Sequence, residues 1–229
     1  MFGCPNPEPV NTMTVHYDAL ETRDPAQREA ALMAALPSQV AHAQANTGAF
    51  AALLQGVDAA AVSNRAALAQ LPVIRKYELL ERQQAQRGSD VFGGFSALRF
   101  GAGMRRVFAS PGTIYEPEGT RADYWRMARA MFAACFKPGE LVHNCFSYHF
   151  TPAGSMMETG AHALGCTVFP GGTGQTEQQV AAMAELRPAG YIGTPSFLKI
   201  IVEKAEELGL TLPSVKKAMF GGEAYPPSL

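Results

Sequence analysis

The stretch at residues 189–220, AGYIGTPSFLKIIVEKAEELGLTLPSVKKAMF, decides the fold class of this chain. Ala189–Ile192 predicts a buried strand and Val215–Phe220 predicts a second one. Between them, Thr194 and Pro195 suit the N-cap and the first position of a helix that extends to Leu208 and ends at Gly209. Two strands joined through a helix predict a parallel pair with a right-handed crossover.

The same alternation precedes this stretch. Helices are predicted over Ala122–Phe136, ended by Lys137-Pro138-Gly139, over Gly154–Leu164, stopped by Gly165, and from Thr176 to Pro188. Strands are predicted over Glu140–Phe146 and Cys166–Phe169. Thr176-Glu177-Gln178-Gln179 has the form of a capping box for the third helix. We therefore expect an α/β fold, with a parallel sheet covered by helices on both faces.

The N-terminal part has a different pattern. Ala26–Gln70 is rich in alanine and leucine at helical spacing, which predicts helices with a break at Pro37. The polar run Glu81–Gly88 predicts a loop-rich junction. We expect two parts: a mainly helical segment over residues 1–90 and an α/β subdomain over residues 91–229.

Small and aromatic residues follow the predicted strands where ligands bind in open α/β sheets, at the carboxyl ends. These residues are Tyr148-His149-Phe150, Gly171–Gly174, Gly193-Thr194-Pro195 and Gly221-Gly222-Glu223. Plainer interpretations stay open. Gly171–Gly174 suits an ordinary turn, Glu223 a solvated turn residue, and Tyr148 and Phe150 core aromatics. We expect Gly171, Gly193 and Gly221 at one edge of the sheet.

A second candidate site lies at residues 107–119, VFASPGTIYEPEG. An apolar run followed by Ser110, Gly112 and Thr113 is typical of a loop that presents N–H and hydroxyl groups to phosphate. The stretch contains no basic residue and carries Glu116 and Glu118. These carboxylates could face the phosphates and repel them, face solvent, or hold magnesium, and the sequence leaves these alternatives open.

Composition narrows the class of protein. The 229 residues are 47% hydrophobic with a formal net charge of −1, which allows a sizeable core and excludes a basic field for nucleic acid. Neither a membrane span nor a leader segment is predicted, so we expect a cytoplasmic protein.

The four cysteines lack CxxC spacing and are expected to be reduced, buried thiols. The pairs Cys145/His149 and His162/Cys166 do not converge as zinc sites require, so we expect no metal site and read His143 and His162 as turn or surface residues.

Six segments carry a resemblance to a known family. They are Leu71–Lys76 (LPVIRK), Ala109–Thr113 (ASPGT), Phe136–Glu140 (FKPGE), Leu164–Pro170 (LGCTVFP), Gly193–Leu198 (GTPSFL) and Phe220–Glu223 (FGGE). In this order and spacing, from about Tyr17 onward, the chain resembles the N-terminal portion of a phenylacetate-CoA ligase. That group is a branch of the adenylate-forming acyl-CoA synthetases.

The resemblance implies a two-step reaction with ATP, Mg²⁺ and coenzyme A. A small aromatic or related carboxylic acid attacks the α-phosphate of ATP, and the CoA thiol then displaces AMP from the acyl-adenylate. It assigns Ser110, Gly112 and Thr113 to phosphate, and Gly221, Gly222 and Glu223 to adenine. Tyr148, Phe150, Gly193 and Thr194 are assigned to the acyl pocket. The oligomeric state is left open, and a homodimer is one of the alternatives.

The resemblance also implies that the chain is incomplete. Beyond the position of Glu223 the family continues with a tyrosine-glycine-x-threonine-glutamate motif and a mobile C-terminal domain carrying the catalytic lysine. No catalytic residue is therefore assigned here, and the 229 residues alone are expected to be inactive. The alternative is a non-catalytic relative whose degenerate phosphate loop left a binding or assembly module.

Overall fold

The computed structural model describes residues 16–227, and contacts within the chain divide it into two compact units. We call residues 18–120 the helical unit, and residues 121–227 with residues 16 and 17 the sheet unit. The division predicted after residue 90, between a mainly helical segment and an α/β subdomain, stays a prediction.

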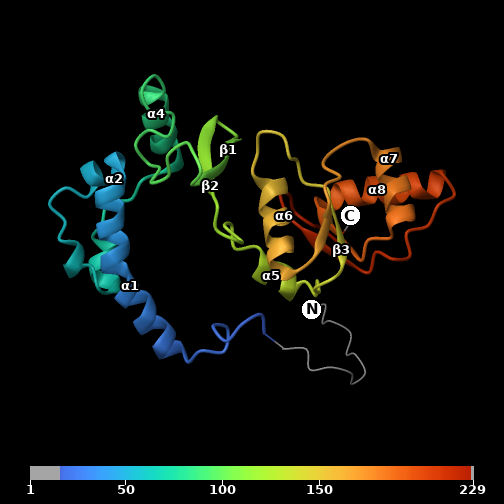
Figure 1. Cartoon of the computed structure of the whole chain (residues 1–229), viewed down its shortest axis with the longest axis horizontal. Helices are drawn as coiled ribbons and strands as arrows, with labels where there is room; N and C mark the ends of the chain where they lie inside the picture. Colours follow the sequence, from blue (N-terminus) through green and yellow to red (C-terminus); the bar gives the residue numbers. More distant parts are fainter. Residues whose placement is uncertain (1–15, 228–229) are drawn as a thin grey trace. The chain divides into compact units, whose positions relative to one another are not determined.

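The helical unit contains four α-helices, one 3-10 helix and a hairpin in its described residues (Figure 1). The helices are α1 (Pro25–Asn46), α2 (Gly48–Leu53), η1 (Ala59–Ala61), α3 (Arg65–Ala69) and α4 (Lys76–Gln86). The strands β1 (Met104–Ser110) and β2 (Ile114–Gly119) pair antiparallel.

Helix α1 passes through Pro37, so the predicted break is wrong. Proline removes a single N–H from the helix, and α1 continues beyond it to Asn46. Pro25 occupies the start of the helix, and the Asp24 side chain accepts hydrogen bonds from the N–H groups of Ala26 and Gln27. Val40 is buried with residues that follow the helix, which holds the part beyond Pro37.

Helix α4 replaces the predicted junction over much of Glu81–Gly88, so that prediction is also wrong. The Arg75 N–H donates to the Glu78 side chain in the first turn. Within the polar run, Gln83 is buried at 2% exposure and bonds to Tyr115 of β2. A polar sequence can therefore form a helix here, because one of its polar side chains has a partner far along the chain.

The sheet unit confirms the predicted α/β fold. Its four strands are all parallel, in the order β4-β3-β5-β6. The strands are β3 (Leu141–Asn144), β4 (Thr167–Phe169), β5 (Gly190–Gly193) and β6 (Lys217–Phe220). The helices are α5 (Ala128–Ala133), α6 (Ala153–Leu164), α7 (Thr176–Leu186) and α8 (Pro195–Glu207).

Helices cover both faces of this sheet, as predicted (Figure 1). Val142 and Ile192 pack in one cluster with residues of α5 and α6. Tyr191, adjacent to Ile192 in β5, packs in the other cluster with residues of α7 and α8. Because successive side chains of a strand point to opposite faces, these short strands are buried on both sides.

Two local predictions in this unit are wrong. The helix predicted over Ala122–Phe136 is confined to α5, because Asp123 and Arg126 have positive φ values of 47° and 61°. The Asp123 carboxylate instead accepts hydrogen bonds from two backbone N–H groups at the start of α5. Thr176 is not an N-cap: that position is Gln175, with a φ of 50° and no capping hydrogen bond from its side chain.

The cysteines match the expectation of reduced thiols only in part. Cys145 and Cys166 are buried free thiols, and burial raises the pKa of Cys145 to about 12. Cys135 is in a disulfide, which the spacing did not predict, and Cys4 lies outside the described residues. Inert thiols such as Cys145 act as core residues rather than nucleophiles.

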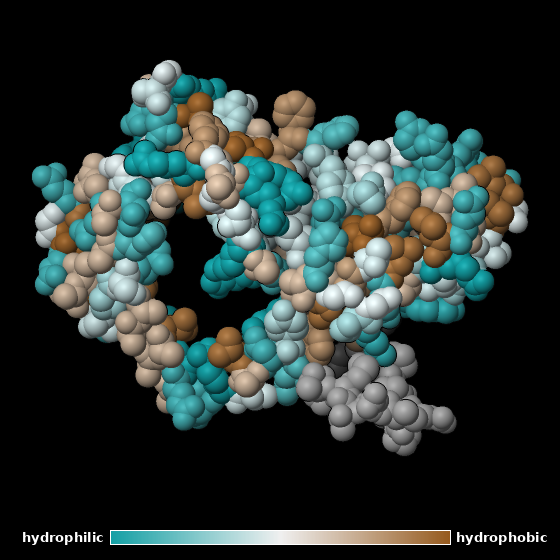
Figure 2. All heavy atoms as spheres, in the orientation of Figure 1, coloured by the Kyte–Doolittle hydropathy of each residue, from teal (hydrophilic) through white to brown (hydrophobic). Residues whose placement is uncertain are grey.

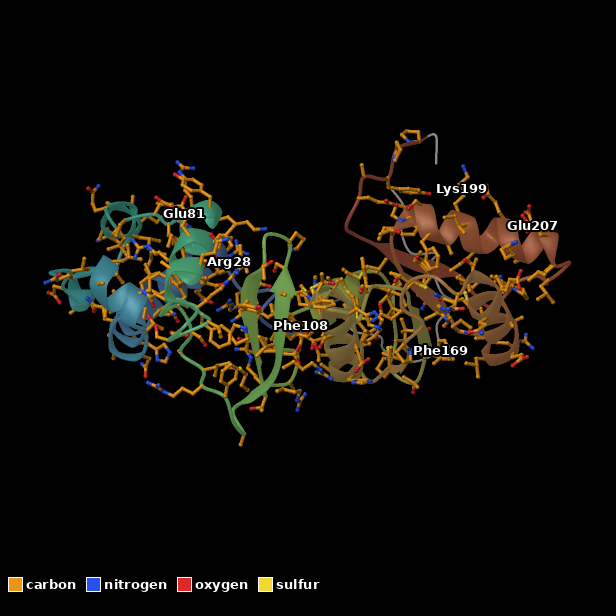
Figure 3. The ribbon with its side chains drawn as sticks, turned by 90° about the horizontal axis from the view of Figure 1, so that it is seen from above. Arg28, Glu81, Phe108, Phe169, Lys199 and Glu207 are labelled. Atoms are coloured by element: carbon orange, nitrogen blue, oxygen red, sulfur yellow. The ribbon has the colours of Figure 1, made fainter. Side chains whose placement is uncertain are left out.

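The surface of the described residues is mixed in character. Figure 2 shows hydrophobic and hydrophilic residues interspersed on the visible face of both units. On α8, charged residues such as Lys199 and Glu207 (Figure 3) alternate with the exposed apolar Ile200 and Val202. Among residues 16–227, no helix combines the length and apolar character needed to cross a membrane.

Candidate functional site

The predicted phosphate loop is the turn of the β1–β2 hairpin. The Thr113 N–H donates to the Ser110 carbonyl at 3.0 Å, with Pro111 second and Gly112 third in the turn. Gly112 has a φ of 98°, so this is the turn geometry that requires glycine at its third position. Gly112 and Thr113 are exposed, and the hydroxyls of Ser110 and Thr113 make no hydrogen bond within the described part of the chain.

The two glutamates lie in β2 rather than in the turn. Glu118 is fully buried, and its carboxylate pairs with the Arg106 guanidinium across the hairpin at 2.8 Å. Glu116 lies opposite Phe108 of β1 and is partly buried. Ion pairing within the hairpin, which was not among the alternatives that the sequence left open, accounts for the position of Glu118, since a buried carboxylate needs a charged partner.

Helix α4 supports this turn through two side chains that the sequence did not single out. Gln83 accepts from the Tyr115 N–H and donates to the Tyr115 carbonyl, both at 2.9 Å. Arg87, the C-cap residue of α4, donates from Nη2 to the Thr113 carbonyl at 2.7 Å. Its guanidinium also lies over the Tyr115 ring, 5.6 Å from the centroid. No local signal marks these contacts, which link residues 26 and more positions apart.

The second group of predicted site residues lies at the carboxyl edge of the sheet. Gly171 follows β4, Gly193 ends β5 and Gly221 follows β6, and these strands are parallel. The prediction that the three glycines share one edge is therefore confirmed. The Gly221 N–H donates to the Gly193 carbonyl at 3.3 Å, which joins two of the predicted subsites directly.

Gly193 and Thr194 are positioned by Tyr191. A Cβ at Gly193 would lie 2.2 Å from the Tyr191 hydroxyl oxygen, so only glycine fits there without a shift. That hydroxyl donates to the Thr194 carbonyl at 2.9 Å. Thr194 is the N-cap of α8, as predicted, and its hydroxyl accepts from the Phe197 N–H. The turn after β5 is thus held by side-chain hydrogen bonds and presents backbone at the sheet edge.

Glu223 binds the N-terminus of the same helix. Its carboxylate accepts from the Ser196 N–H at 2.7 Å. Hydrogen bonds from the Ser196 side chain and backbone hold the pKa of Glu223 below its ordinary value. The segment Gly221-Gly222-Glu223 is therefore tethered to α8 at an exposed position, and Glu223 is not simply a solvated turn residue.

The Gly171–Gly174 loop is held by one buried amide. Gln179 Nε2 donates to the carbonyls of Gly172 and Gly174 at 2.9 and 2.8 Å. Its Oε1 lies 2.7 Å from Nε2 of His143 and accepts from the Cys145 thiol at 3.0 Å. A Cβ on Gly171 would lie 2.6 Å from the Gln179 Oε1 atom. Packing against this network, beyond turn geometry, excludes a larger residue at Gly171.

His143 is therefore not a turn or surface residue, and that prediction is wrong. It lies in β3 at 1% exposure, stacked on Phe169 of β4. Burial lowers the pKa of the His143 imidazole below its ordinary value of 6.5. His162 is exposed, as predicted. No group of three or more His, Cys, Asp or Glu side chains that could hold a metal ion occurs among the described residues.

Tyr148 and Phe150 have different surroundings. The Tyr148 hydroxyl accepts from the Asn144 amide at 2.8 Å, and its ring approaches the backbone at Gly172. Tyr148 thus borders the sheet edge. Phe150 is 81% exposed with a φ of 60°, so it is not a core aromatic.

Comparisons with known proteins place this geometry in a family context. No family model matches the chain. The chain is 30% identical over 180 residues to the phenylacetate-coenzyme A ligase of Aromatoleum evansii, covering 75% of this chain and 39% of that protein. It is 30% identical over 181 residues to the phenylacetate-coenzyme A ligase of Thermus thermophilus, covering 74% and 38%.

Solved structures agree on the fold. The 2-hydroxyisobutyryl-CoA ligase in the postadenylation state matches with a TM-score of 0.80 at 21% identity, over 96% of this chain and 49% of that chain. Its open conformation, in complex with 2-HIB-AMP and CoA, matches with a TM-score of 0.78 at 22% identity, over 87% and 45%. The chain spans about two fifths of the length of the curated relatives it matches. With this sequence similarity, the chain is a homologue of the phenylacetate-coenzyme A ligases and has part of the core fold of the adenylate-forming acyl-CoA ligases.

Proposed function

We propose that this chain provides the ATP- and acid-binding part of an AMP-forming acid-CoA ligase. The observation that carries the proposal is the 30% identity to phenylacetate-coenzyme A ligases over three quarters of the chain. Since the chain spans only about two fifths of those relatives, the whole reaction belongs to a protein that also carries the remaining part.

The proposed roles follow the two sites. Ser110, Gly112 and Thr113 bind the phosphates of ATP, a role that suits an exposed turn with uncommitted hydroxyls. Gly221, Gly222 and Glu223 form a floor for adenine, and their tether to α8 supports this because a fixed backbone surface suits a flat ring. Tyr148, Phe150, Gly193 and Thr194 border the pocket for the acyl group.

The reaction proposed for the longer protein, which also carries the remaining part, has two steps. A carboxylate oxygen bonds to the α-phosphorus of ATP and pyrophosphate leaves with the electron pair of the broken P–O bond. The thiol sulfur of coenzyme A then bonds to the acyl carbon, its proton is lost and AMP leaves. The turn at Ser110–Thr113 would hold the phosphate chain in line, because positioning and charge stabilisation dominate phosphoryl chemistry. Mg²⁺ would accompany ATP and help to neutralise the charge of its phosphates.

Three further assignments complete the proposal. The acid is a small aromatic or related carboxylic acid, as in the phenylacetate-coenzyme A ligases. The proposal also places the protein in the cytoplasm, and a homodimer is one assembly that it allows. The competing candidate is a non-catalytic binding or assembly module, which is favoured by the lack of a basic residue in the 107–119 stretch and by the carboxylate of Glu116.

The test is pyrophosphate release by the protein that the complete reading frame encodes, screened over aromatic and short aliphatic acids. Phenylacetamide, which lacks the nucleophilic oxygen, serves as the matched control for phenylacetate. We expect acid-dependent release from that protein and none from the 229 residues alone. If none of the acids in the panel causes pyrophosphate release, the result would favour the non-catalytic module.

A further inference from the structure

The proposed phosphate turn has no cation of its own, but the fold brings one to it. No Lys, Arg or His occurs between Val107 and Gly119. Arg87, at the end of α4, reaches the turn and donates from Nη2 to the carbonyl of Thr113 at 2.7 Å. A phosphate-binding turn needs positive charge beside its N–H and hydroxyl donors, because several anionic oxygens must be neutralised together.

The charge of Arg87 has no carboxylate partner within the described part of the chain. Two other arginines of the helical unit differ in this respect: Arg65 pairs with Glu29, and Arg106 pairs with Glu118. The Nε atom of Arg87 is buried and has no hydrogen-bond partner in the described structure. A held guanidinium with an unused buried donor is uncommon in proteins unless something else compensates it.

The contacts of Arg87 also fix where it can act. The Tyr115 ring and the Thr113 carbonyl together hold the guanidinium against the hairpin turn. Thr113 uses one N–H of Nη2 and the Nε–H is buried, which leaves the other N–H groups of Nη1 and Nη2 for a ligand at the same turn. The exposed backbone of Gly112 and the hydroxyls of Ser110 and Thr113 lie in that turn.

We propose that Arg87 is a phosphate-binding residue that supplies, from α4, the positive charge that the hairpin turn lacks. The ligand class is a polyphosphate chain, either as inorganic polyphosphate or as part of a nucleotide. The proposal rests on the proposed function in that it assigns the same turn to phosphate. The planar guanidinium suits this role because it presents parallel donors to phosphate oxygens.

Calorimetric titration of the 229-residue chain with inorganic tripolyphosphate and with ATP tests the assignment. Arg87→Gln removes the charge but keeps an amide that can donate to the Thr113 carbonyl. Arg82→Gln removes the same charge from an exposed position on the same helix and is the matched control. We expect Arg87→Gln to weaken both ligands about ten- to a hundredfold, and Arg82→Gln to change them less than about twofold.

A labelling experiment on the unmodified chain removes any dependence on the folding of the variant. Phenylglyoxal reacts with accessible guanidinium groups, and mass spectrometry reports the rate at each arginine. Tripolyphosphate should slow labelling of Arg87 severalfold and leave Arg82 unchanged. Equal effects of tripolyphosphate and ATP would identify the phosphate chain as the ligand. An effect of ATP alone would mean that binding requires the nucleoside, and it would overturn the assignment to any polyphosphate chain.

The outcomes separate this assignment from the function on which it rests. If the unmodified chain binds tripolyphosphate or ATP, but Arg87→Gln binds as tightly and labelling of Arg87 is unprotected, the role of Arg87 is refuted and the turn remains a phosphate site. If the unmodified chain binds neither ligand, both the assignment of Arg87 and the phosphate role of the turn fail.

Discussion

Replacing Gln179 by methionine should destabilise the sheet unit, because the side chain keeps its length and loses its amide. The amide makes four hydrogen bonds: it donates to the carbonyls of Gly172 and Gly174, and it accepts from His143 Nε2 and from the Cys145 thiol. A typical bond contributes about 1 kcal/mol, and a buried group left without a partner costs about 1–3 kcal/mol. Gly174 is exposed and can turn to water, and the thiol is a weak donor. We therefore expect a loss of about 2–3 kcal/mol.

The chain contains a natural probe for this measurement. Its only tryptophan, Trp125, belongs to the same unit as Gln179, so its fluorescence during urea denaturation reports that unit. Gln178→Met is the matched control, since Gln178 is the exposed neighbour on α7. With an unchanged m-value, a loss of 2–3 kcal/mol lowers the midpoint clearly. A change in Gln179→Met below about 0.5 kcal/mol, or equal to that of Gln178→Met, would refute the role of the amide network.

Arg106→Ala should destabilise the hairpin by about 2–4 kcal/mol, because it leaves the buried carboxylate of Glu118 without its charged partner. This loss is at or below the usual cost of unpairing a buried charge, because Arg106 is 41% exposed and water can reach Glu118 once the side chain is removed. Faster hydrogen exchange in β1 and β2 would show this, with exposed Arg105→Ala as the control; equal exchange in both variants would contradict it. Because the folded pKa of His143 is lowered, the unfolded chain binds the proton first, so stability is retained above about pH 6.5 and falls below it. Urea midpoints of the unmodified chain and of His143→Gln, measured from pH 7.5 to 5.5, check this. An equally steep fall of the midpoint in both would show that groups other than His143 cause the pH dependence.

The periodic parts of the sheet unit were predictable because their signals are local. Thr194 and Pro195 have the residue types favoured at a helix start, and Gly165, with a φ of 86°, has the residue type favoured at a helix end. The alternation of such helices with short apolar strands led to the parallel sheet. From that topology alone, Gly171, Gly193 and Gly221 had to share an edge.

Predictions failed where a distant partner outweighed local preference. Gln83 turns part of a polar run into a supported helix because Tyr115 offers both backbone groups to its amide. Gln179, predicted as part of a capping box, binds Gly172 and His143 instead. In both cases burial makes an unpaired polar group costly, so the fold selects the partner.

The sequence by itself determined the family resemblance, the parallel sheet and the position of its candidate ligand edge, because each depends on order and spacing along the chain. Only the tertiary structure decided how the charges near the hairpin turn are arranged. It buried Glu118 against Arg106 and brought Arg87 to Thr113 across 26 positions of the chain. Electrostatic interactions depend on distance and burial, and neither quantity can be obtained from separation along the chain.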